Sequence, residues 1–167
     1  MLTLDFKKAQ ELVAEAIAAK GADFVYEKEG SSCKYVHGID RVWDEEEECY
    51  IDSGFENAVP GCLVGDALKR GGIPIEVLGG EYVNDSGSDE LLSTLQDKDF
   101  VRVSDRAREY LGDLQASQDS GAAWGVADEK ARQGIQFVPV FDGDNKKTGE
   151  LRECVFEDRG DLSDVPH

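Results

Sequence analysis

Two segments, residues 62–73 and 110–125, constrain the fold most, because each combines helical periodicity with glycines that end the helix. In the first, an apolar stripe that begins at Leu63 stops at Gly71 and Gly72. In the second, a helix that carries Tyr110 and Leu114 is broken by Gly121, and a further helix carrying Trp124 ends at Gly134. Small Ala and Gly residues in these segments favour close packing of the helices.

Other helices follow from caps and spacing. Residues 6–20 predict an amphipathic helix that Asp5 caps and Gly21 ends. Ser104 is a suitable N-cap for the helix around Tyr110. Pro60 suits the first turn of a helix whose apolar stripe begins at Leu63 and which ends at Gly71 and Gly72, and shorter helices are expected near residues 73–78 and 89–95.

Two β-hairpins are expected. Residues 24–26 and 33–36 are short, aromatic and β-branched, and a turn composition at 29–32 separates them. Residues 137–141 and 151–156 form the second pair around a polar loop at 142–149, with Pro139 at an edge or a bulge. Together these elements predict a single α+β domain over residues 1–157, with an N-terminal helix and a helical cluster packed on a small antiparallel sheet. Residues 158–167 are expected to form a mobile tail.

The chain is strongly acidic. Its 167 residues carry 36 Asp and Glu against 18 Lys and Arg, for a net charge of −18. Such a charge disfavours direct binding to nucleic acid or to anionic membranes. The acidity either keeps the protein in solution or imitates nucleic acid in a basic groove, and we favour the first. No secretory signal or apolar run of about 20 residues is found, so a cytosolic protein with reduced thiols is expected.

An unbroken acidic run at residues 44–48 stands inside a stretch, 39–58, that reads as an insertion. Because its charges repel one another, a solvated loop is expected. Trp43, Tyr50, Ile51 and Phe55 flank the run. They either pin the loop to the body or form a binding surface, and packing against the body is favoured.

Catalytic and metal-binding patterns are weak. Cys33, His37, Cys49 and Cys62 could in principle hold zinc, but their spacing lacks the close cysteine pair of most zinc sites. Residues 142–153 imitate a calcium loop but place Lys147 where glycine is needed. No nucleophile motif and no phosphate-binding loop is present. We therefore expect no enzymatic activity, no metal and no cofactor.

Both glycine-ended segments resemble uncharacterised small accessory proteins of actinobacteriophages, of the mycobacteriophage and Streptomyces phage type. The first pattern is carried by Cys62, Leu63, Val64, Gly65, Leu68, Arg70, Gly72 and Ile73. The second is carried by Leu111, Leu114, Gln115, Gln118, Asp119, Gly121, Trp124, Gly125 and Ala127. An upstream part of the same proteins is similar at Tyr26, Cys33, Tyr35 and Val36. The acidic stretch and the C-terminal hairpin have no counterpart in this resemblance.

The resemblance implies a phage protein that acts in the host cytoplasm, and it carries over no catalytic residue. The leading hypothesis is a non-enzymatic accessory protein that binds a host or phage protein; homodimerisation stays open. The alternatives are an acidic nucleic-acid mimic and a small hydrolase or nucleotide-binding protein with an unrecognised site. The candidate binding residues are Trp43, Asp44, Glu45, Glu46, Glu47, Glu48, Gln115, Gln118, Asp119 and Trp124. For the last four, stabilisation of a helix junction is favoured over ligand binding.

Overall fold

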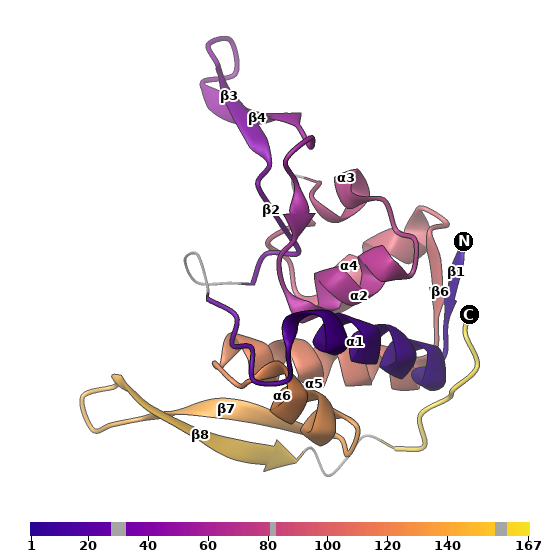
Figure 1. Ribbon diagram of the computed structural model, residues 1–167, viewed down its shortest axis with the longest axis vertical. Helices are drawn as coiled ribbons and strands as arrows, with labels where there is room; N and C mark the ends of the chain where they lie inside the picture. The colour runs from indigo at the N-terminus through magenta and orange to yellow at the C-terminus, as the bar shows by residue number, and fades with distance from the viewer. Residues whose placement is uncertain (28–32, 81–82, 156–159) are drawn as a thin grey trace.

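The computed structural model describes residues 1–27, 33–80, 83–155 and 160–167. Within them the helices are α1 (Phe6–Lys20), α2 (Leu63–Arg70), α3 (Ile75–Leu78), α4 (Ser88–Asp97), α5 (Asp105–Asp119) and α6 (Trp124–Ala131). These helices form the centre of the molecule, with short strands around them (Figure 1), which confirms the predicted α+β class. No helix of the described part is both long and apolar enough to cross a membrane.

The helix boundaries follow the local signals in the sequence. Asp5 Oδ1 accepts a hydrogen bond from the Lys8 N–H at 2.7 Å, which satisfies one of the free donors of the first turn of α1. Ser104 Oγ does the same for the Ala107 N–H of α5 at 3.1 Å. Gly21 ends α1 with a positive φ of 107°. The long helices α1 and α5 pack on α2, and most of the buried apolar side chains belong to the helices.

Within the described residues, the strands form four separate pairs. β1 (Leu2–Leu4) is parallel to β6 (Val101–Val103). The other three pairs are antiparallel: β2 (Val36–His37) with β5 (Val59–Pro60), β3 (Asp40–Asp44) with β4 (Cys49–Gly54), and β7 (Ile135–Phe141) with β8 (Lys147–Val155). The predicted C-terminal hairpin is confirmed, and its register shifts between Pro139 and Phe141, where a proline that cannot donate a ladder hydrogen bond is tolerated.

The predicted hairpin between residues 24–26 and 33–36 is wrong. Residues 24–26 form no strand, and Val36 pairs with Pro60 instead. Phe24 packs edge-on against Trp124 of α6, with ring centroids 4.7 Å apart, so a tertiary contact outweighs the local strand propensity. The turn expected at residues 29–32 lies outside the described residues.

The start of α2 also differs from expectation. Pro60 lies in β5, and the helix begins only at Leu63, with Cys62 as its N-cap. The helix packs closely on the preceding segment at Gly65, where a Cβ atom would stand 2.4 Å from the Tyr35 carbonyl oxygen. A larger residue at this position would force the two segments apart.

Two hairpins extend from the helical centre in different directions. β3–β4 stands away from the helices at the top of Figure 1, whereas β7–β8 runs across the bottom of the view. β7 contacts α5 and α6, so that hairpin is supported along part of its length. The β3–β4 hairpin has no such support from a helix in the described part of the chain.

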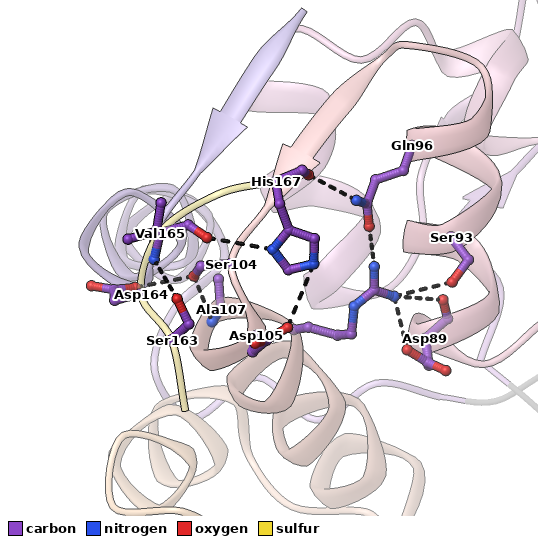
Figure 2. A network of polar contacts seen from close by, with 11 residues as sticks. Asp89, Ser93, Gln96, Ser104, Asp105, Ala107, Ser163, Asp164, Val165 and His167 are labelled. Atoms are coloured by element: carbon purple, nitrogen blue, oxygen red, sulfur yellow. Dashed lines mark hydrogen bonds and ion pairs between the residues drawn. The ribbon is translucent and has the colours of Figure 1, made fainter. Parts of the chain in front are cut away.

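Residues 160–167 lie against the helix starts, as Figure 2 shows. Asp164 Oδ1 accepts hydrogen bonds from the Phe6 N–H at 2.7 Å and from Ser104 Oγ at 3.0 Å. The Asp164 carboxylate therefore accepts hydrogen bonds at the N-termini of both α1 and α5, where negative charge is favoured. The His167 carbonyl oxygen accepts from Gln96 Nε2 at 2.9 Å. Mobility of this tail stays a prediction, but the structure gives it defined contacts.

Candidate binding surface on the β3–β4 hairpin

The candidate surface is the projecting hairpin, which we define as β3, β4 and the turn at residues 45–48. Trp43 lies opposite Tyr50 in its register, and Val42 lies opposite Ile51. Because successive side chains of a strand point to opposite faces, Trp43 and Tyr50 share one face and Val42 and Ile51 the other. The hairpin is therefore apolar on both sides.

These four side chains are unusually exposed. Trp43 is 49% exposed and Tyr50 is 63% exposed, and their rings meet edge to face with centroids 5.1 Å apart. Val42 and Ile51 are also exposed. Single exposed apolar residues are ordinary, but an exposed apolar pair on each face of one slender element is a surface of the kind found at interaction sites.

The acidic run forms the tip of the hairpin, and the predicted solvated loop is confirmed. Asp44 Oδ1 accepts hydrogen bonds from the N–H groups of Glu46 at 2.8 Å and Glu47 at 3.1 Å. Glu48 takes a positive φ of 50°, which turns the chain into β4. Residues 45–48 are exposed, so the tip presents a dense negative charge held in a defined turn.

The favoured expectation that the flanking apolar residues pack on the body is wrong for three of the four. Trp43, Tyr50 and Ile51 are exposed, and only Phe55 packs against the core. The two strands extend the chain away from the helices before Trp43 is reached (Figure 1), so Trp43 contacts the Tyr50 ring and not the described core. Val42 forms the exposed pair on the other face with Ile51, and the sequence composition does not reveal this pairing.

The candidate residues on α5 lie elsewhere and inside the protein. Gln118 is 1% exposed; its Oε1 accepts from the Leu63 N–H at 2.7 Å, and its Nε2 donates to Cys33 Sγ at 3.1 Å. Gln115 Oε1 accepts from the Tyr35 hydroxyl at 2.9 Å. Both amides tie α5 to the start of α2 and to the segment around Tyr35. The contacts of Gln115 and Gln118 agree with the interpretation that these residues stabilise a helix junction. That junction is with α2, however, and not with α6.

The other two candidates are also set apart from the hairpin. Trp124 is fully buried at the start of α6, where its ring contacts Phe24. Asp119 is half-buried at the end of α5. The structure therefore divides the ten candidate residues into an exposed group on the hairpin and a mostly buried group on α5 and α6, and it does not bring the groups together.

The four residues of the weak zinc alternative are not gathered either. Cys33 and Cys62 are both buried beside Gln118 and the start of α2, and burial together with the neighbouring Cys62 thiol raises the pKa of Cys33. Cys49 is exposed on β4, and the His37 ring contacts the Tyr26 hydroxyl at 2.7 Å. Among the described residues no three His, Cys, Asp or Glu side chains are placed to hold a metal.

The geometry of this chain is the basis for assigning its function. Comparison with protein-family models, with curated proteins and with solved structures finds no match in any of the three.

Proposed function

We propose that the chain is a non-enzymatic protein-binding protein whose projecting hairpin docks into a partner protein. The exposed Trp43–Tyr50 pair supports this most directly, since its rings contact each other and project with the hairpin away from the helices. On the basis of its resemblance to actinobacteriophage accessory proteins, we further propose that the chain is a phage protein. It would act in the host cytoplasm on a host or phage partner.

The hairpin specifies the chemistry of that partner. Aromatic side chains dominate interface energetics, and covering the exposed parts of Trp43 and Tyr50 would contribute about 2–3 kcal/mol each. The acidic tip favours a slot rimmed by Lys or Arg, which would speed association and orient the hairpin. The partner therefore presents an apolar slot with a basic rim.

Nucleic-acid mimicry is the second candidate, and the acidic turn at residues 44–48 is the observation that favours it. A purely electrostatic mimic would depend on its acids and would lose its target in salt. The exposed apolar residues on both faces of the hairpin favour a contact with an apolar component instead. The two functions therefore differ in which side chains carry the affinity.

The test is affinity capture from actinobacterial lysate with three versions of the tagged protein. The versions are the wild type, a Trp43→Ser/Tyr50→Ser double variant and a Phe141→Ser control. Phe141 is 49% exposed on the other hairpin, so its removal changes a similar surface at a different place. We expect one protein to be retained by the wild type and the control and lost by the double variant. Equal retention by all three would rule out the hairpin as the docking element.

A further inference from the structure

A small cavity at the base of the projecting hairpin has a lining unlike the rest of the chain. It has a volume of about 190 Å³, and its polar lining residues are Lys34, His37, Arg41 and Asn84. Among the described residues, none that lines the cavity carries a carboxylate, although the chain has twice as many acids as bases. Two cations facing one hollow in so acidic a protein create a local preference for an anion.

Both cations keep donors available for a ligand. Lys34 Nζ contacts Asp85 at 3.3 Å, but that carboxylate is 61% exposed, so the pair is screened by water. Arg41 donates through Nε to Asp52 at 3.0 Å. Within the described part of the chain, neither terminal nitrogen of Arg41 has a hydrogen-bond partner. A guanidinium held at Nε presents its two terminal nitrogens as donors to an oxyanion.

Hydrogen bonds fix the Asn84 amide and the backbone beside the cavity. Asn84 is 4% exposed and is bonded to Val36 on both sides of its amide, with Oδ1 accepting from the Val36 N–H at 2.8 Å and Nδ2 donating to the Val36 carbonyl at 2.9 Å. The Lys34 N–H donates to Tyr26 Oη at 3.1 Å. Gly38 turns the chain with a φ of 72°, and a Cβ there would stand 2.5 Å from the Asn57 carbonyl oxygen. The backbone that carries Lys34 is therefore held by defined contacts, which lowers the cost of ordering the site when a ligand binds.

We propose that this cavity binds a phosphate group, with Lys34 and Arg41 contacting its oxygens. A phosphate group presents more charge and more acceptor oxygens to two separate cations than a carboxylate, which has one charge and two oxygens. The cavity is smaller than the roughly 300–1,000 Å³ typical of drug-sized ligands, so it fits a phosphate group rather than a whole nucleotide. The cavity shares Arg41 of β3 with the hairpin but not the exposed aromatic pair, because neither Trp43 nor Tyr50 lines it.

The test is a titration of the ¹⁵N-labelled protein with inorganic phosphate, followed by amide NMR shifts at constant ionic strength and pH. We expect saturable shifts at Val36, His37 and Gly38 below about 50 mM phosphate, because two charge-assisted contacts in a small open site imply millimolar binding. Acetate titrated in the same way should bind more weakly. Tighter binding of acetate would overturn the assignment to phosphate.

Variants decide whether the cavity is responsible. Arg41→Gln and Lys34→Gln should each raise the dissociation constant about tenfold, the factor expected for one lost charged hydrogen bond. Arg102→Gln is the control, since it removes the same charge from an exposed position on β6. Unchanged spectra far from the cavity would show that each variant folds. Equal weakening by all three variants, or shifts that grow without saturation, would contradict the proposal.

Discussion

Replacement of Gln118 by alanine gives the sharpest test of how the helices are held together. The change leaves the buried Leu63 N–H without its acceptor and Cys33 Sγ without its donor. An unsatisfied buried donor costs about 1–3 kcal/mol, and the space left by the truncated side chain adds about 1–2 kcal/mol. We therefore expect Gln118→Ala to lower the free energy of unfolding by about 3 kcal/mol, roughly a hundredfold in the unfolding equilibrium.

Urea unfolding followed by tryptophan fluorescence measures this loss, because Trp124 is buried. Gln118→Met keeps most of the volume and removes the acceptor, so it should lose only the hydrogen-bond part, about 1–3 kcal/mol. Gln133→Ala, at an exposed position after α6, is the matched control and should stay within about 0.5 kcal/mol of wild type. If Gln118→Ala cost no more than Gln133→Ala, the argument that Gln118 anchors α2 would be refuted.

Three further predictions follow from buried and exposed groups. Asp164→Ala should lower the free energy of unfolding by about 1–2 kcal/mol in the same urea assay, because one carboxylate serves two helix N-termini. In native protein treated with iodoacetamide, mass spectrometry should find Cys49 alkylated and the buried Cys33 protected until denaturant is added. Burial raises the pKa of Cys33, Tyr35 and Tyr110, so the unfolded state loses these protons first as pH rises. Stability in urea should therefore be full below pH 9 and fall above it by about 1.4 kcal/mol per pH unit for each group once its unfolded pKa is passed.

Each of these three predictions would be contradicted by a specific experimental result. Wild-type stability in the Asp164→Ala variant would mean that the tail does not rest on the helix starts in solution. Equal alkylation of Cys33 and Cys49 without denaturant would mean that the region around Gln118 opens readily. A flat stability profile from pH 8 to about pH 11 would contradict the raised pKa of the buried groups.

The helices could be predicted because their signals are local. Asp5 and Ser104 cap the helices that follow them, and Gly21, Gly71 and Gly121 come directly after helices or helix ends. A cap depends on residues within one turn, so a short window of sequence contains what is needed.

Strand partners could not be predicted in the same way. Val36 pairs with Pro60 and not with the nearer segment at residues 24–26, because the Asn84 amide and the Gly61 and Cys62 N–H groups bind the backbone of this segment. These contacts join residues far apart in the chain. β-Propensity reports only that a segment suits a strand, not which strand it meets.

The site was predicted in part. Charge repulsion in the 44–48 run is a local property and correctly indicated a solvated loop. The exposure of Trp43 and Tyr50 depends on how far the hairpin stands from the helices, which composition does not report. The basic cavity was missed because Lys34, Arg41 and Asn84 come together only through the fold.

The central claim is that the apolar faces of the projecting hairpin carry the affinity for a protein partner. The most direct measurement is the dissociation constant of the captured partner, determined by calorimetry in low and high salt for the wild type, the Trp43→Ser/Tyr50→Ser variant and a variant with Glu45–Glu48 changed to Gln. The account predicts that loss of the two aromatic residues weakens binding at least about a hundredfold at both salt concentrations, while the Gln variant and added salt have smaller effects. Binding that survives the loss of both aromatic residues but disappears with the acids or in high salt would contradict it and establish electrostatic mimicry instead.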